Sequence, residues 1–197
     1  IRVNSDNELY GVNYDSELKT NQLSLINLED GTSEVIAPIT FASGYWQSGN
    51  FTVSDDYAYA LGSNFYDDIT QQDLGPDLIS IDLGTKDSNT IFLDSSFQSI
   101  RVNSDNELYG VNYDSELQTN QLSLINLDDG TSEVIAPITF ASGYWNSGNF
   151  TLSDNYAYAL GSSFFDEITQ QDLGPDLITI DLDTKNSNTV FLDSSFQ

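Results

Sequence analysis

The sequence predicts an all-β chain made of four similar units, and three observations support this fold class. Residues 1–98 align without a gap on residues 100–197 at an offset of 99, and the two copies differ at twelve positions. Each copy divides again into two related units of about 50 residues, a period typical of arrays of small β units. Apolar residues do not persist at the three-four spacing of a helix, whereas β-branched and aromatic residues are abundant.

The two units of each copy differ in one loop. Residues 9–12 fall on residues 58–61 at an offset of 49, whereas residues 23–28 fall on residues 78–83 at an offset of 55. The growing offset indicates an insertion of roughly five residues within the acidic segment 67–77. We therefore expect short-loop and long-loop units to alternate along the chain.

Each unit has room for four strands. The first unit holds β-prone runs at residues 1–3, 8–13, 23–28 and 33–36. Between the third and fourth runs, Gly31 follows Asp30 and supplies the positive φ that a tight hairpin needs. The second unit has residues 84–87 at the same place, so the hairpin is expected there with different residues.

Few architectures suit an all-β repeat of this length, and a radial array of four-stranded antiparallel blades is the favoured one. The sequence thus predicts a β-propeller arrangement with four blades per chain. Residues 1–99 would form blades 1 and 2, and residues 100–197 would form blades 3 and 4. Together they would make one propeller domain or half of one.

The blade sequences resemble those of quinoprotein and YVTN-type propellers. The resemblance lies in an aromatic second strand, at residues 9–12 and 57–61, followed by a third strand of the L-x-x-I-D-L type, at residues 23–28 and 78–83. It covers all four units. The tryptophan-docking signature of quinoproteins and the Gly-His and Trp-Asp pairs of WD40 repeats are both absent, so the resemblance implies the fold and no family activity.

The order of the strands leaves the closure of the ring open. The chain is expected to begin with the innermost strand of one blade and to finish with the outermost strand of another. Four blades could close alone, two chains could meet head to tail as eight blades, or the chain could be part of a longer array. Symmetric closure by identical heterologous contacts is common, and we favour the homodimer.

The composition excludes several classes of function. Acidic residues number 31 against five basic ones, which gives a net charge of −26 and repels nucleic acids and anionic membranes. The chain has no His and no Cys, which removes the commonest general base and every thiolate site. No stretch is long and apolar enough to span a membrane. We expect a soluble, non-catalytic protein and can assign no compartment.

The long loops and the blade connections should lie on one side of the disc. The two Trp residues fall in such connections, so Tyr45, Trp46, Tyr144 and Trp145 are candidates for a carbohydrate platform. The alternative is that these rings fill the gap between neighbouring blades, where a large amphipathic ring packs well. We favour the packing interpretation.

Acidic residues of the same loops are candidate calcium ligands, because calcium prefers oxygen donors. They are Asp67, Asp68, Asp73, Asp77, Asp166, Glu167, Asp172 and Asp176. No EF-hand loop pattern is present, and a pair of these carboxylates would also meet the loose requirement of a glycosidase. Arg2 and Arg101 are predicted on innermost strands, where they could line a central channel and attract an anion.

The leading functional hypothesis is a non-catalytic structural or interaction scaffold, arisen by repeat amplification or engineered from such a repeat. The alternative is a carbohydrate- or calcium-binding module that uses the Trp residues and the acids of one side. No cofactor is expected.

The charge makes a first testable prediction. Between about pH 5 and pH 3 the carboxylates protonate and self-repulsion falls, so association of the chain should increase on acidification. Light scattering across that range measures the association. A chain that remains monomeric at every pH would contradict the prediction.

Overall fold

The computed structural model describes residues 1–42, 46–140, 145–162, 164–166, 168–169, 171–173 and 175–192. It contains four antiparallel sheets of four strands each, and the predicted all-β blade architecture is confirmed. Blade 1 consists of β1 (Arg2–Val3), β2 (Leu9–Asp15), β3 (Thr20–Ile26) and β4 (Ser33–Ile39). Blade 2 consists of β5 (Trp46–Val53), β6 (Tyr57–Asp67), β7 (Gln72–Asp82) and β8 (Ser88–Phe92).

The second copy repeats this order. Blade 3 consists of β9 (Phe97–Val102), β10 (Leu108–Asp114), β11 (Thr119–Ile125) and β12 (Ser132–Ile138). Blade 4 consists of β13 (Trp145–Leu152), β14 (Tyr156–Gly161), β17 (Asp176–Asp181) and β18 (Ser187–Phe191). A separate two-stranded sheet is formed by β15 (Phe164–Asp166) and β16 (Gln171–Leu173).

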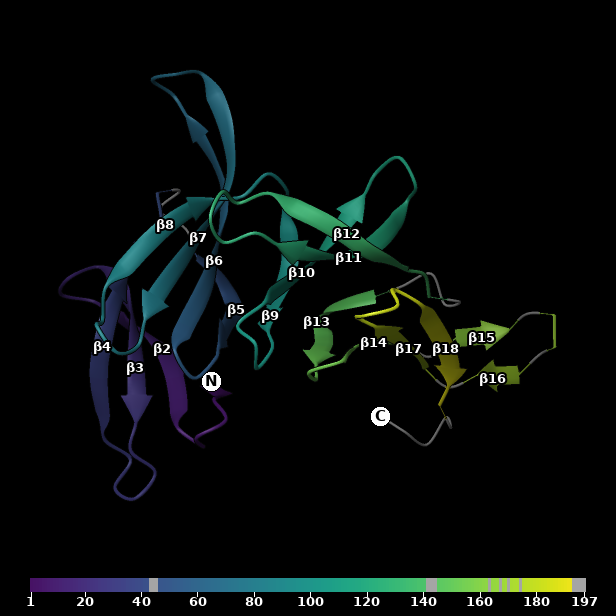
Figure 1. The fold of residues 1–197 in the computed structure, drawn as a ribbon, viewed down its shortest axis with the longest axis horizontal. Helices are drawn as coiled ribbons and strands as arrows, with labels where there is room; N and C mark the ends of the chain where they lie inside the picture. The colour runs from purple at the N-terminus through teal and green to yellow at the C-terminus, as the bar shows by residue number, and fades with distance from the viewer. Residues whose placement is uncertain are drawn as a thin grey trace.

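The four blades form an open arc, with blade 1 at one end and blade 4 at the other (Figure 1). The innermost strands contact one another in chain order, from β1 to β5, β9 and β13. The prediction that each blade begins at its inner strand is therefore correct. The chain is a partial propeller, not a closed four-bladed ring.

The hairpin between the third and fourth strands is conserved in geometry but not in residues. In blade 1, Gly31 adopts a φ of 74° and donates its N–H to the Asn27 carbonyl at 2.9 Å. In blade 2, Lys86 occupies the same position with a φ of 66° and donates to the Asp82 carbonyl at 2.8 Å. The sequence prediction of one turn built from two different residue sets is confirmed.

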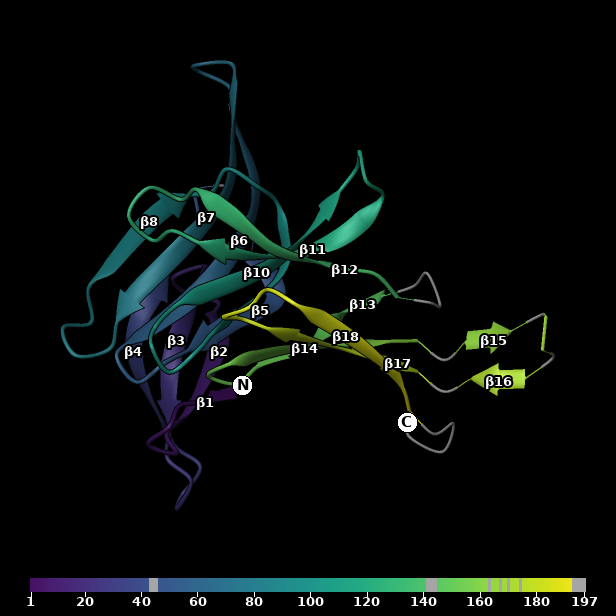
Figure 2. The same ribbon diagram turned by 45° about the vertical axis from the view of Figure 1, so that its right-hand side comes forward.

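The insertion differs from the loop that the sequence predicts, because it continues the strands. In blade 2, β6 and β7 remain paired as far as Asp67 and Gln72, and only a short turn joins them. In blade 4 the corresponding extension is the β15–β16 pair. Both hairpins project from the arc (Figure 2). Adjacent aromatic residues, Phe65 and Tyr66 in blade 2 and Phe164 and Phe165 in blade 4, favour extended backbone in these segments.

Hydrophobic cores lie between neighbouring blades, not within them. One cluster joins blades 1 and 2 through residues such as Leu23 and Phe51, and its repeat joins blades 3 and 4. A third cluster joins blades 2 and 3 and includes Leu78, Ile100 and Leu108. Each blade is therefore stabilised by its neighbours, as expected of a repeat architecture.

The repeat supplies a matched test of this packing at two glycines. A Cβ atom at Gly110 would overlap the ring of Phe97, the first residue of β9. At Gly11 the nearest atom would be the Cδ1 atom of Ile26 at 3.1 Å, the end of a flexible side chain. We expect Gly110→Ala to destabilise the chain by roughly 1–3 kcal/mol and Gly11→Ala by less than about 0.5 kcal/mol. Urea unfolding of the two variants measures the difference, and equal losses would contradict this account.

Among the described residues, no helix is long and apolar enough to cross a membrane.

Candidate functional site

The duplication places the same residue in two environments, which shows directly which surfaces the arc leaves uncovered. Large apolar residues in corresponding turns are equally exposed in the two copies. Leu18 and Leu117 are each 69% exposed, and Ile69 and Ile168 are 93% and 94% exposed. A difference in exposure between copies therefore marks a surface that only one copy has covered.

Blade 1 has such a surface on the side that faces away from blade 2. Ile1 is 74% exposed, whereas its counterpart Ile100 is 0% exposed because blade 2 covers it. The same difference in burial holds for the other residues of what we name the first end face: Val3, Leu9, Ile26 and Leu28, whose more buried counterparts are Val102, Leu108, Ile125 and Leu127. The first end face is an apolar blade surface without a neighbouring blade.

Blade 4 has the complementary surface. Val190 is 46% exposed, whereas its counterpart Ile91 is 8% exposed against blade 3. The remaining residues of the last end face are Tyr156, Leu160, Leu177 and Leu192. Each is more exposed than its counterpart in the first copy, which is Tyr57, Leu61, Leu78 or Leu93. The two end faces are thus the two halves of the contact that blades 2 and 3 make inside the chain.

The interior contact has polar bonds as well as an apolar core. The Ser54 hydroxyl and the Tyr59 hydroxyl of blade 2 donate to the Asn106 Oδ1 atom of blade 3, at 2.8 and 3.1 Å. The Val102 amide of blade 3 donates to the Thr52 hydroxyl of blade 2 at 3.2 Å. Directional bonds of this kind fix the register of two packed surfaces.

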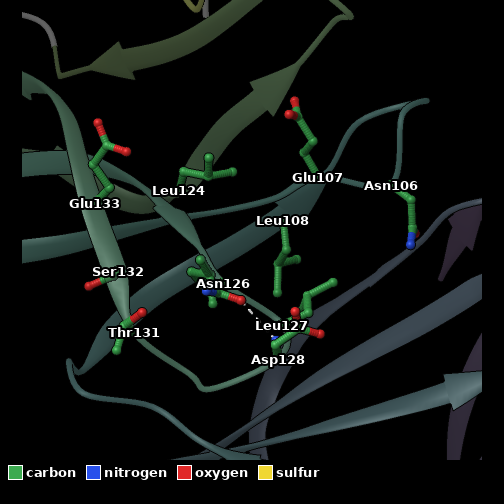
Figure 3. A pocket seen from close by; sticks show the side chains of 11 residues that line it. Asn106, Glu107, Leu108, Leu124, Asn126, Leu127, Asp128, Thr131, Ser132 and Glu133 are labelled. Carbon is green, nitrogen blue, oxygen red and sulfur yellow. Dashed lines mark hydrogen bonds between the residues drawn. The ribbon is translucent and has the colours of Figure 1, made fainter.

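A hollow lies on blade 3 beside this contact. It has a volume of about 510 Å³, and Leu108, Leu124 and Leu127 line it together with Asn106, Glu107, Asp128 and Glu133 (Figure 3). A hollow of about 490 Å³ occupies the corresponding place on blade 1. Because it occurs in both copies, the hollow belongs to the blade unit. Leucine side chains and carboxylates are both among the residues that line it.

A second hollow of about 540 Å³ lies between blades 1 and 2. It holds an ion pair of Lys86 Nζ with Glu34 Oε1 at 2.8 Å, and the Tyr10 hydroxyl donates to Glu8 Oε2 at 2.8 Å. Burial, together with the bond to Glu8, raises the pKa of Tyr10, so this phenol stays protonated and acts as a donor. The Lys86–Glu34 ion pair joins blade 2 to blade 1, and the Tyr10–Glu8 bond lies within blade 1.

Trp46 is at the edge of a hydrophobic core. Its side chain is half-buried and packs against the cluster between blades 1 and 2. Its Nε1 atom is buried without a hydrogen-bond partner among the described residues. Tyr45, Tyr144 and the side chain of Trp145 lie outside the described residues. The interblade packing predicted for these rings stays the favoured interpretation.

The candidate calcium ligands do not share one place. Asp67 and Asp68 lie at the hairpin tip, and Asp67 accepts bonds from the Thr70 hydroxyl at 2.7 Å and the Ile69 amide at 2.9 Å. Asp77 lies in the middle of β7, where it pairs with Phe92, five residues beyond Gln72 and so about 16 Å from the tip. In the described part of the chain, no three acidic side chains gather in a way that would hold a metal.

For four other candidate calcium ligands the structure describes no side chain. Asp73, Asp166 and Asp172 lie on the hairpin strands, and their side chains, like Glu167 as a whole, are outside the described residues.

Asp77 and Asp176 are buried instead of presented to solvent, at 0% exposure each. The Ala42 amide, in the connection from blade 1 to blade 2, donates to Asp77 Oδ2. A Cβ atom at Gly62 would overlap Asp77 Oδ1, so the glycine lets this carboxylate approach the sheet. Asp77 therefore ties the third strand of one blade to the connection from the preceding blade, a role that sequence reasoning missed.

Arg2 and Arg101 lie on the innermost strands β1 and β9, as predicted. Each guanidinium stacks on a phenylalanine of the next inner strand: Arg2 lies 5.4 Å from the Phe51 ring and Arg101 6.0 Å from the Phe150 ring. Burial, with a smaller contribution from the charge of Arg2, lowers the pKa of Arg101 to about 10. Cation–π packing against the next blade accounts for both positions.

Turn carboxylates limit the pH range in which association can be tested. Hydrogen bonds from turn amides and hydroxyls lower the pKa of Asp15, Asp30, Asp67, Asp114, Asp129 and Asp181. Their contribution to folding is fully present above the unfolded value of about 3.9 and is lost as the pH falls through the lower folded values. Increased association should thus be sought between about pH 5 and 4, where these bonds remain intact.

No protein-family model and no curated protein matches the sequence. Solved structures do match. TolB from Acinetobacter baumannii matches 96% of the chain with a TM-score of 0.62 and 15% identity, and a protein of unknown function from Bacteroides thetaiotaomicron matches 95% with a TM-score of 0.58 and 13% identity. The β-propeller domain of the Trilobed protease from Pyrococcus furiosus matches 78% with 8% identity and a TM-score of 0.48, and the fold assignment does not depend on it.

These likenesses define the chain as a partial β-propeller and go no further than the fold. The chain spans 42% of TolB and 46% of the Bacteroides protein, which is less than half of either.

Proposed function

We propose that this protein is a non-catalytic propeller scaffold that acts through its two end faces. The observation that carries the proposal is the exposure of Ile1 and Val190, at 74% and 46%, where Ile100 and Ile91 are buried in the same fold. Contiguous exposed apolar surface of this kind marks an interaction site. The surface that the fold leaves uncovered is thus at the ends of the arc, and on blade 1 it includes the hollow that Leu9, Ile26 and Leu28 line.

The origin of the repeat fits this function. The blade sequences are similar to the quinoprotein and YVTN type, and twelve differences between the copies suit duplication followed by divergence better than a designed repeat. Duplicating a two-blade unit creates new blade contacts from an existing one, because every unit carries both halves of the contact. A scaffold extended in this way needs no new binding chemistry.

A single introduced cysteine tests the proposal, since the chain has no cysteine of its own. An environment-sensitive fluorophore at Val3→Cys or Val190→Cys reports each end face, and the same label at Leu18→Cys reports the loop side. We expect the end-face labels to respond as the chain concentration rises, with no change at Leu18. A response of the Leu18 label to calcium or to a soluble glycan, with silent end-face labels, would replace the scaffold by the carbohydrate- or calcium-binding alternative.

A further inference from the structure

We infer that the partner of each end face is the opposite end face of a second copy of this chain, so that two chains close an eight-bladed ring head to tail. The inference rests on the proposed function and names its partner. Both halves of the contact are present in one chain, at opposite ends of the arc, and the contact itself already exists between blades 2 and 3. A second copy therefore brings a surface whose shape and chemistry the fold is known to accept.

The polar residues of the interior contact have counterparts on the free faces. Asn7 corresponds to Asn106 and adopts the same φ of 63°, so its side chain starts from the same backbone geometry. Ser153 and Tyr158 on blade 4 correspond to Ser54 and Tyr59. Ser153 is exposed, whereas Ser54 is 9% exposed. Joining the two faces would let the Ser153 and Tyr158 hydroxyls of one chain donate to Asn7 of the other.

The amount of surface is consistent with this partner. The accessible surface is 11137 Å², whereas the relation between mass and surface gives about 9,250 Å² for a compact monomer of 21.8 kDa. The excess of about 1,900 Å² is comparable to the total area that one stable protein interface buries. The projecting hairpins, with Ile69 and Ile168 at their tips, and the exposed apolar side chains of the two end faces both add to this surface.

The number of blades selects a ring of two chains. Propellers have four to eight blades as a rule, and two four-bladed arcs make eight whereas three would make twelve. Head-to-tail contacts that do not close would instead give an open filament. Two identical contacts per ring also make each contact more effective, because the second forms within one complex.

Two double variants test the head-to-tail arrangement. Val3→Lys with Leu28→Lys disrupts the first end face, and Tyr156→Lys with Val190→Lys disrupts the last end face. All four positions are at least 41% exposed, so the single chain should still fold. Lysine lowers the net negative charge, so a loss of association cannot come from greater repulsion. Leu18→Lys with Ile69→Lys is the control, with the same charge change at two exposed positions off the faces.

Mass is measured by light scattering at about 0.5 M salt, where the screening length is only a few ångströms. The wild-type chain and the control should have a mass of about 44 kDa, twice the 21.8 kDa of one chain. Each face variant alone should be monomeric. An equimolar mixture of the two should recover a dimer, because the last face of one and the first face of the other remain intact.

Other outcomes overturn the inference. Dimers of either face variant alone would show a contact between like faces, and a series of larger species would show an open filament. A wild-type chain that stays monomeric would show that a second copy does not cover the faces. In the first two cases the labels at Val3 and Val190 would still respond to chain concentration, and the scaffold function would stand. A monomeric chain would leave both labels silent, and a calcium or glycan response at Leu18 would then remove the scaffold as well.

Discussion

Replacement of Ile100 by alanine is expected to destabilise the chain by about 3 kcal/mol, whereas Ile1→Ala leaves the stability of the dilute chain unchanged. The two residues are the same position of the repeat, but Ile100 is 0% exposed in the core between blades 2 and 3 and Ile1 is 74% exposed. Removing three carbons from a full core leaves a cavity, and removing them from an open surface does not.

Thermal unfolding at low protein concentration measures the stability that each of the two variants loses. A loss of about 3 kcal/mol lowers the Tm by roughly 6–12 °C in a chain of this size. A second pair, Leu108→Ala and Leu9→Ala, repeats the comparison inside a strand, with the greater loss at the buried Leu108. Equal losses at Ile1 and Ile100 would mean that blade 1 is covered within a single chain, and the arc would then close on itself.

Asp77→Ala is expected to cost about 2–4 kcal/mol, because a fully buried acceptor and its volume are removed together. The Ala42 amide also loses the acceptor that it has in the folded chain. Asp77→Asn retains an oxygen acceptor of the same size and should lose less than half as much. The same order is expected at Asp176, which is equally buried.

Urea unfolding near neutral pH tests how much the Asp77 carboxylate contributes to stability. Asp68→Ala is the control, since this exposed turn residue should change stability by less than about 0.5 kcal/mol. If Asp77→Ala were neutral or stabilising, the cost of burying the charge would exceed the value of its bonds, as happens for some buried ions. The tie between the two blades would then not be a source of stability.

Most of the fold could be predicted from the sequence, because local patterns carry it. The near-perfect repeat identified the units, the β-prone runs gave the strands, and Gly31 marked a turn. The same turn at Lys86 was predicted from its position in the repeat and not from its residue type, since lysine rarely adopts a positive φ. The extended hairpins were missed, because turn-forming residues at 67–77 read as a loop while pairing across β6 and β7 depends on both strands.

The candidate sites were harder to predict, since a residue type does not reveal its surroundings. Asp77 was a candidate ligand as one of several loop acids, but the approach that Gly62 permits and the Ala42 amide make it a buried tie. Trp46 was expected to be a packing residue, and its half-buried side chain contacts the cluster between blades 1 and 2. The residues that follow Ile1 and Ile100 are identical as far as Leu18 and Leu117, so local composition does not predict that one isoleucine is exposed and the other buried.

The sequence by itself determined the repeat, the strand class, the order of strands in each blade and the strong negative charge, because each depends on local composition or on periodicity. Only the tertiary structure decided that the four blades form an open arc, that Asp77 and Asp176 are buried, and that the two ends carry complementary apolar faces. The physical reason is that burial is a property of neighbours. Nearly identical sequences give similar blades, but the blade at each end of the arc has a neighbour on one side only in this structure, and the side chains of its other side are more exposed.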